Sequence, residues 1–544
     1  MAHLILGPLL RYTGSTQATV WVETDAPCDV AVLGAHARTF CVEGHHYALV
    51  VLSGLEEGAV TPYDVQLDGE SVWPPDDGRP PSAIHTRAGE RSARLVFGSC
   101  RVGDPAREPY TLPPDSHPLG FGIDALWALS RRLQTGSEEW PDCLLLLGDQ
   151  VYADETSEQT RAFIRARRDT SAPPGDQVAD FEEYTQLYRE AWSDPDIRWL
   201  LATVPSTMIF DDHDVHDDWN ISDAWVQEMR ATDWWEERII GAFMAYWIYQ
   251  HIGNLAPPEL SEEPLLAELP AMADGGARLR RLARDCDREP ASSRFAFCRD
   301  FGRSRLVVID SRAARVLADG RRDMVDDDEW RWIAEHARGR FDHLIIASTL
   351  PVFMTPGIDG FEAWNEALCS GAWGRLAARG GERLRRALDL EHWPAFQRSF
   401  RTMVDLLREL AEAADAPATI TLIGGDVHTA YIAEVDLGDE QRSRTFQIVC
   451  SPFRNPLAAK ERRVIRLFST RAAGVACRAL ARAAGVRRPD VAWRLVTPIT
   501  FDNSIAVLEL DERRATVVIR KSAPEGDDGW PLEELHRLAL TPAP

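Results

Sequence analysis

The stretch LLLLGDQVYAD at residues 144–154 begins with four leucines and changes at once to glycine, aspartate and other small or polar residues. An uninterrupted apolar run of this length is typical of a buried strand, although a short piece of buried helix has the same pattern. In α/β folds, ligands bind outside the carboxyl ends of such strands. Asp149 is therefore positioned to bind or bridge a metal ion, and the alternative is that it caps a helix. Tyr152 reaches the same point if the chain turns helically there.

A second apolar run has a denser polar continuation, MIFDDHDVHDD at residues 208–218. Five aspartates and two histidines follow the apolar residues within eight positions, and the carboxylates repel one another unless cations lie nearby. Carboxylate oxygens suit hard cations, whereas imidazole suits iron or zinc. The alternative is a solvated acidic loop, which an apolar strand leading directly into the segment disfavours. We therefore expect a metal-linked role for Asp212.

Two more runs end in residues that can ligate metals, LIGGDVH at 422–428 and LVFGSCR at 95–101. Asp426 and His428 alternate by two, so on an extended strand both point to one side. The paired glycines before them let the backbone pass close to a ligand. A lone strand-end cysteine such as Cys100 is more often inert packing, but the other three strand ends make it a candidate ligand.

Taken together, the four strand ends offer thiol, carboxylate, phenol and imidazole groups in numbers sufficient for two or more metal ions. Paired metals activate a hydroxide and hold the phosphoryl oxygens during in-line displacement. The residues alone therefore indicate metal-dependent hydrolysis of phosphate esters.

The chain has 544 residues, too many for one hydrophobic core, and its patterning changes near residue 90. Before that point, short runs rich in β-branched and aromatic residues are separated by turn signals, which predicts a small all-β sandwich over residues 1–90. Near the end of this region, the Pro/Gly/Asp-rich stretch at residues 74–81 indicates a linker. Residues 91–544 alternate apolar runs with helical segments, which predicts a layered α/β domain. The helices are expected at residues 181–192, 224–251, 329–337 and 394–414, and a final hairpin at residues 504–519.

Composition excludes some classes of function. The net charge of −25 repels polyanions, so a nucleic-acid scaffold role is excluded, but bound cations still permit a small phosphate-ester substrate. Nine scattered cysteines without a CxxC pair predict reduced thiols. We find neither a signal peptide nor a transmembrane segment and predict a cytoplasmic protein.

The order Gly-Ser-Cys, Gly-Asp-x-x-Tyr-x-Asp, Asp-Asp-His-Asp and Gly-Asp-Val-His resembles the PhoD-like alkaline phosphatase family, a branch of the calcineurin-like metallophosphoesterases. The resemblance covers most of the chain. It implies an α/β metallophosphoesterase-type two-sheet sandwich flanked by helices, preceded by a small all-β sandwich of fibronectin or immunoglobulin type. It also implies an alkaline phosphatase-like phosphomonoesterase that acts by a metal-activated hydroxide.

The resemblance further assigns roles to residues of this chain. A ferric ion (Fe3+) would be held by Cys100, Asp149, Tyr152 and His428. One or more divalent ions would be held by Asp149, Asp212 and Asp426; the ion is Ca2+ in secreted members, and Mg2+, Mn2+ or Zn2+ suits an intracellular enzyme. His213 would contact the substrate phosphate and protonate the leaving oxygen, with Asp214 orienting it. Arg101 and Arg312 are weaker candidates for phosphate contacts, because structural ion pairs explain both arginines better.

Two departures separate this chain from other metallophosphoesterases. Gly-Ser-Cys stands where those enzymes begin with Asp-x-His, and residues 347–351 lack the metal-binding histidine that follows their third strand. Both departures fit the PhoD-like branch.

Three alternatives stay open. The same metals would support a phosphodiesterase, including phospholipase D-like cleavage, and the fold could also persist as a non-catalytic binding module. The arginine-rich segment at residues 462–488 would contact an anionic membrane if it formed a free amphipathic helix. The favoured interpretation is a helix docked through its apolar face.

Overall fold

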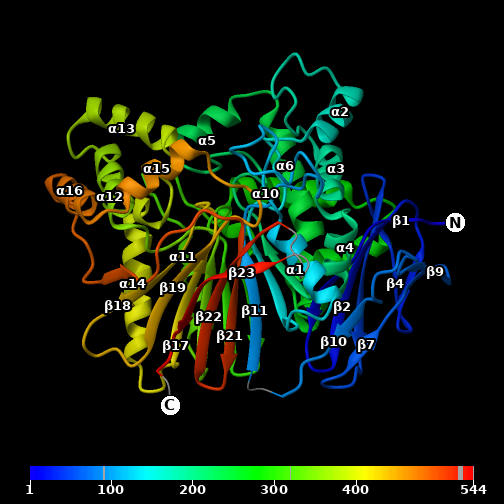
Figure 1. Ribbon diagram of the computed structural model, residues 1–544. Helices are drawn as coiled ribbons and strands as arrows, with labels where there is room; N and C mark the ends of the chain where they lie inside the picture. The colour runs from blue at the N-terminus through cyan, green and yellow to red at the C-terminus, as the bar shows by residue number, and fades with distance from the viewer. Residues whose placement is uncertain (90–91, 319, 525–530, 543–544) are drawn as a thin grey trace.

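The computed structural model describes residues 1–89, 92–318, 320–524 and 531–542. Two mixed β-sheets form its centre (Figure 1). The first has the order β13-β12-β11-β21-β22-β23, from β11 (Ser92–Gly98), β12 (Cys143–Leu147), β13 (Ser206–Ile209), β21 (Ser504–Asp511), β22 (Arg514–Ser522) and β23 (Leu532–Ala539). The second has the order β14-β15-β16-β17-β19-β18-β20, from β14 (Phe297–Phe301), β15 (Ser304–Ile309), β16 (His343–Ser348), β17 (Thr419–Gly424), β18 (Ala430–Asp436), β19 (Arg444–Cys450) and β20 (Ala492–Leu495).

The alternating direction of side chains along the strands of the second sheet explains how this sheet packs on both of its faces. Leu306 and Val308 of β15 belong to the large apolar cluster that also contains the strands of the first sheet. Val307 and Ile309 belong to a separate cluster with α11 (Asp327–Ala337) and α14 (Gln397–Glu412). Because successive strand side chains point to opposite faces, one face of this sheet meets the first sheet and the other is covered by helices.

Helices also cover the outer face of the first sheet, where α1 (Ala125–Gln134) and α4 (Pro195–Thr203) share its apolar cluster. The other helices are α2 (Glu158–Arg167), α3 (Phe181–Trp192), α5 (Asp223–Arg230), α6 (Trp235–Ala245), η1 (Tyr246–His251), α7 (Ile252–Asn254), α8 (Pro257–Glu262), α9 (Pro264–Glu268), η2 (Leu269–Ala271), α10 (Gly276–Arg288), η3 (Pro290–Ser292), α12 (Pro356–Cys369), α13 (Arg375–Ala387), η4 (Trp393–Ala395), α15 (Ala459–Phe468) and α16 (Arg471–Ala483). In Figure 1, α12, α13, α15 and α16 gather at one corner, on the opposite side from the N-terminal strands.

The N-terminal region is all-β, as predicted. One sheet has the order β1-β2-β6-β5, a second has the order β4-β3-β8-β9, and β7 pairs with β10. An apolar cluster between the two larger sheets is separate from the cluster of the central sheets. The strands are β1 (Leu4–Thr13), β2 (Gln17–Thr24), β3 (Asp29–Val32), β4 (Ala35–Arg38), β5 (Phe40–Val42), β6 (His45–Ser53), β7 (Val60–Pro62), β8 (Val65–Leu67), β9 (Glu70–Trp73) and β10 (Ala83–His85).

A buried arginine joins the N-terminal strands to the rest of the chain. Arg11 of β1 has no exposed surface, and its guanidinium donates to the backbone carbonyls of Ser206 at 3.1 Å, Tyr249 at 2.6 Å and Gln250 at 2.8 Å. These acceptors satisfy the buried charge with fixed dipoles. The N-terminal region is therefore anchored directly to β13, the strand that leads into the Asp211–Asp218 loop.

Most predicted elements are present, with two corrections. The helices at residues 181–192, 329–337 and 394–414 correspond to α3, α11 and α14, and the final hairpin to β21 and β22. The helix expected at residues 224–251 is instead α5, α6 and a π-helical turn, and the arginine-rich segment forms two helices, α15 and α16. The domain boundary predicted between residues 90 and 91 lies outside the described residues. No helix in the described part of the chain is long and apolar enough to cross a bilayer.

Candidate active site

The loops after β11, β12, β13 and β17 bring Cys100, Asp149, Asp212 and His428 into two groups of ligand atoms; the predicted ligand Asp426 belongs to neither group, and Asp211, which was not predicted, belongs to the second. Ligand atoms of Cys100, Asp149 and His428 all lie within 4.8 Å of one another. The same limit holds for Asp149, Asp211 and Asp212, so that Asp149 belongs to both groups. Two adjacent ligand sets with a shared carboxylate are the arrangement that a pair of bridged metal ions requires.

Four of the predicted ligands have an unusual backbone. Cys100, Asp149, Asp426 and His428 adopt positive φ angles of 57°, 50°, 63° and 49°. A non-glycine residue in this region costs about 1–3 kcal/mol and persists where the surrounding structure over-determines it. Such strain is concentrated at functional sites, and here it falls at the ends of strands from both central sheets.

Hydrogen bonds join the strand ends at this edge, the first between the two sheets and the second within the first sheet. The Asp426 amide donates to Ser99 Oγ at 2.9 Å, and the Cys100 amide donates to the Gly148 carbonyl at 3.3 Å. A Cβ atom on Gly425 would lie 2.3 Å from Ser99 Oγ, which explains the need for glycine. Gly425 thus packs against the side chain of Ser99 at the end of β11.

The electrostatics of the site fit a bound cation. Both carboxylate oxygens of Asp149 are buried without a hydrogen-bond partner. Burial, followed by neighbouring carboxylates, raises the pKa of Asp149 and of the Cys100 thiol well above their usual values. Burial lowers the pKa of His428 to about 4, which keeps its imidazole neutral and able to ligate a metal. Buried carboxylates of this kind are stabilised when they coordinate metal ions.

Tyr152 lies close to this group but not in a helical turn. The chain from residue 150 to 156 is a series of bends, and the Tyr152 hydroxyl accepts a hydrogen bond from Asn455 at 3.0 Å. The phenol ring packs against the His213 imidazole with 4.8 Å between ring centroids. Tyr152 therefore joins the loop after β12 to the histidine of the loop after β13.

Asp154 contacts His213, in the position that the sequence had suggested for Asp214. The His213 Nδ1 atom lies 3.0 Å from Asp154 Oδ1, and Asp154 is almost fully buried on its side chain. Although burial opposes the charge, Asp154 raises the pKa of His213 well above its usual value. The Gly-Asp-x-x-Tyr-x-Asp motif contained this residue, but only the fold shows that its last carboxylate faces the next strand end.

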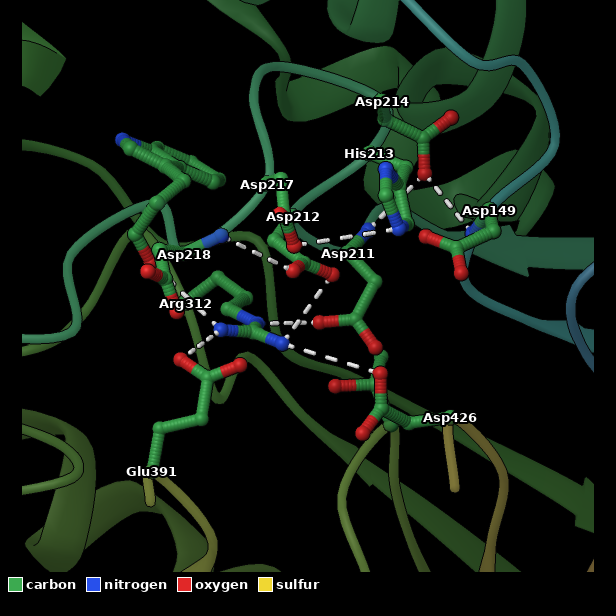
Figure 2. Close-up of polar contacts among 12 residues, drawn as sticks. Asp149, Asp211, Asp212, His213, Asp214, Asp217, Asp218, Arg312, Glu391 and Asp426 are labelled. Atoms are coloured by element: carbon green, nitrogen blue, oxygen red, sulfur yellow. Dashed lines mark hydrogen bonds and ion pairs between the residues drawn. The ribbon is translucent and has the colours of Figure 1, made fainter. Parts of the chain in front are cut away.

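Asp214 was predicted to orient His213, but in the structure it binds backbone N–H groups instead. Its carboxylate accepts backbone N–H groups from Asp149 at 2.9 Å and Asp211 at 2.8 Å (Figure 2). It also accepts those of Gln150 at 3.2 Å and Val151 at 3.3 Å. These donors belong to the loops after β12 and β13. Asp214 therefore fixes the backbone of two ligand-bearing loops relative to each other.

Both predicted phosphate-binding arginines are engaged in structural ion pairs. Arg101 is buried and donates to Asp124 at 2.7 Å, the residue that caps α1. Arg312 has no exposed surface and lies among carboxylates of the site (Figure 2). It pairs with Asp211, with Glu391, with Asp212 at 3.1 Å and with Asp426 at 3.8 Å.

Two residues that follow α13 were not found from the sequence. Glu391 pairs with Arg312, and His392 lies between Glu362, 2.6 Å from Nδ1, and Asp426, 3.3 Å from Nε2. They lie in a loop without an apolar run before them, so no strand-end signal marks them. His392 thus connects a proposed metal ligand to a fully buried glutamate on α12.

Comparison with known proteins supports the resemblance. Residues 130–262 match the family model described as PhoD-like phosphatase, and residues 1–85 match a model described as a domain of unknown function (DUF7800). A solved structure described as "Structure of PhoD" matches with a TM-score of 0.59 and 11% sequence identity, covering 97% of this chain and 88% of that chain. No curated protein matches the sequence. At 11% identity the structural match establishes the fold alone, so the chain has the fold of PhoD across nearly its whole length and matches the PhoD-like phosphatase family model at residues 130–262.

Proposed function

We propose that this chain is a metal-dependent phosphomonoesterase of the alkaline phosphatase type. The observation that carries the proposal is the pair of buried, unpartnered oxygens on Asp149, shared by two groups of ligand atoms. The match of residues 130–262 to a phosphatase family supports the reaction class. We further infer a metallophosphoesterase-type sandwich over residues 91–544, preceded by a small β-sandwich domain of fibronectin or immunoglobulin type over residues 1–90.

The donor set suggests how two kinds of metal would be held. Cys100, Asp149, Tyr152 and His428 offer thiolate, carboxylate, phenolate and imidazole to a ferric ion. Asp149, Asp212 and Asp426 offer oxygens alone, which suits Ca2+, Mg2+ or Mn2+, and Zn2+ also accepts carboxylate. When bound, such a pair supplies a hydroxide nucleophile at neutral pH and neutralises the phosphoryl oxygens.

The chain's own residues perform the remaining work. Asp154 holds the Nδ1 side of His213, which leaves Nε2 to donate a proton to the leaving oxygen of the ester. Arg312 partly neutralises the carboxylates of the divalent site and so reduces their mutual repulsion. Asp214 keeps the loop of Asp149 in register with the loop of Asp212.

The test compares metal content and turnover in one set of proteins. Wild-type protein, Asp149→Asn and His213→Asn are purified without added metal, and p-nitrophenyl phosphate hydrolysis is measured after metal analysis. We expect iron and a divalent ion in the wild type, loss of metal in Asp149→Asn, and retained metal in His213→Asn. Both variants should lose more than about a hundredfold in turnover. Asp439→Asn, an exposed change in a turn, is the matched control.

Two alternatives give different results in the same assay. A phosphodiesterase, including one with phospholipase D-like activity, would hydrolyse bis(p-nitrophenyl) phosphate faster than the monoester. A non-catalytic binding module would hydrolyse neither compound after metal reconstitution. Wild-type turnover in both site variants would refute the assignment of the site.

A further inference from the structure

One corner of the molecule has a charge opposite to that of the chain as a whole. Residues 356–388 and 456–488 contain fourteen basic and five acidic side chains, a net charge of +9 in a chain of −25. They include α13, α15 and α16, which pack around α12. We call residues 356–388 and 456–488 the helical cap.

The cap also exposes large apolar side chains. Leu376 is 83% exposed, Leu467 and Val475 are each 62% exposed, and α15 has no buried residue at all. The remaining exposed apolar residues of the cap are Trp373, Leu388, Val464 and Leu480. Seven large exposed apolar side chains on one group of helices indicate a surface that binds a partner.

The helices of the cap pack closely against one another. A Cβ atom on Gly360 of α12 would lie 2.9 Å from the Arg478 backbone nitrogen, and one on Gly474 of α16 would lie 2.8 Å from Pro356. The glycines therefore allow α12 and α16 to pack in close contact, with Cys477 and Ala481 buried between the helices. Leu467 of α15 and Val475 of α16 are each 62% exposed and so lie outside this contact.

Several cap arginines have no counterion. Among the described residues, no carboxylate oxygen lies within 4.0 Å of the guanidinium groups of Arg375, Arg379, Arg463, Arg471 or Arg482, by contrast with Arg462, which pairs with Asp115 at 3.0 Å. Free cationic groups beside exposed leucine and valine form a surface that is at once basic and apolar.

The cap adjoins the candidate active site. The chain leaving α13 continues directly to Glu391 and His392, and the chain entering α15 comes from Asn455, which donates to the Tyr152 hydroxyl. A surface bound to the cap would therefore lie beside the loops that carry the site.

We propose that the helical cap docks the protein on an anionic lipid bilayer. Basic side chains near an anionic leaflet are attracted to its surface, while leucine, valine and tryptophan enter the boundary of the acyl region. A nucleic acid or other soluble polyanion would use the arginines but leave the apolar residues in water. A second copy of this chain would bring two strongly basic faces together, which Coulomb repulsion opposes. This inference goes beyond the hydrolase proposal and does not depend on it.

Vesicle flotation tests the proposal with the intact chain. Wild-type protein is mixed with vesicles of phosphatidylcholine alone, and with vesicles containing about one third phosphatidylserine. We expect flotation with the anionic vesicles only, and its loss at high salt because screening weakens the attraction. The variant Leu376→Ser/Leu467→Ser/Val475→Ser should bind at least tenfold more weakly.

Matched controls distinguish docking through the cap from non-specific hydrophobic adsorption and from catalysis. Leu33→Ser/Val60→Ser removes exposed apolar residues from the N-terminal region and should float like the wild type. Hydrolysis of soluble p-nitrophenyl phosphate should be equal in all three proteins, so a failed hydrolase proposal and a failed docking proposal give different results. Absence of wild-type flotation, equal flotation with neutral vesicles, or a dimer that the serine variant abolishes would each overturn the proposal.

Discussion

His45 joins the N-terminal sheet to α3 through two carboxylates, and its charge should make stability depend on pH. Its Nδ1 atom lies 3.1 Å from Glu23 of β2, and its Nε2 atom lies 2.7 Å from Glu182 of α3. Burial alone would lower the pKa of His45, but the hydrogen bonds with Glu182 and Glu23 outweigh it and raise the pKa to about 9. The folded protein therefore holds this proton more tightly than the unfolded chain does.

The magnitude follows from the difference between the pKa of His45 in the folded protein and in the unfolded chain. A histidine in an unfolded chain has a pKa of 6.5, and each tenfold gain in proton affinity corresponds to about 1.4 kcal/mol, so the protonated contacts of His45 stabilise the fold by about 3 kcal/mol. Because the folded pKa is the higher one, this contribution is complete below pH 6.5. It decreases as the pH rises and is lost once the pH exceeds about 9.

Urea unfolding of the wild type and His45→Gln from pH 6 to pH 10 measures this contribution. The difference in unfolding free energy should be about 3 kcal/mol at pH 6 and should approach zero near pH 10. His36→Gln, which removes a histidine 60% exposed on its side chain and paired with Asp29, is the matched control and should show a small difference at every pH. A constant difference between wild type and His45→Gln across this range would refute the reasoning.

Three further predictions concern the candidate site. Asp154→Asn should lower turnover about 10- to 100-fold but should have little further effect in a His213→Asn background; equal losses in both backgrounds would exclude the coupling. Arg312→Met should destabilise the metal-free protein by about 3–5 kcal/mol in urea unfolding, and added divalent metal should stabilise the variant more than the wild type. Gly148→Ala should lower the free energy of unfolding more than Gly136→Ala does. Both glycines have positive φ, but of the two only Gly148 would place its new Cβ atom against another atom, 2.5 Å from Asp211 Cβ. Equal losses of stability would contradict this reasoning.

The strands that carry the site were predictable from sequence because they are buried on both faces. The four leucines of β12 lack the alternation of a half-exposed strand, and the apolar runs of β12, β13 and β17 end within one residue of the strands themselves. Since parallel strands bring their carboxyl ends to one edge, the polar residues after them were expected to meet. The proximity of Cys100 and Asp149 follows from this reasoning, because β11 and β12 are parallel neighbours, whereas His428 lies in the loop after β17 of the second sheet.

The pairing of side chains around that edge was not predictable in the same way. Asp154 and Asp214 are both acidic residues near His213 in sequence or in motif, and nothing in their spacing decides which one faces the imidazole. Which carboxylate contacts His213 depends on how the loop after β12 bends, because the backbone N–H groups of that loop donate hydrogen bonds to Asp214. His392 was missed for a related reason, since its loop follows an amphipathic helix and carries no strand signal.

The prediction of one long helix at residues 224–251 was wrong because of how the segment packs. Apolar and aromatic residues continue through the whole segment, but α5 ends at Arg230 and α6 begins at Trp235. Trp225 and Trp235 pack edge to face across the break with 5.3 Å between ring centroids. Tertiary contacts between the two helices thus replace the continuous hydrogen bonding that periodicity alone predicts.

The left-handed backbone at the strand ends connects the fold to the proposed chemistry. Cys100, Asp149, Asp426 and His428 each adopt a conformation that costs about 1–3 kcal/mol, and an extended or helical continuation would avoid this cost. The compensation comes from contacts between loops, in which Asp214 and Ser99 accept backbone N–H groups from neighbouring strand ends. Ligands held in this way are positioned before any metal arrives, so binding does not have to order them. A site of this kind should therefore bind metal without a large change in the secondary structure of the chain.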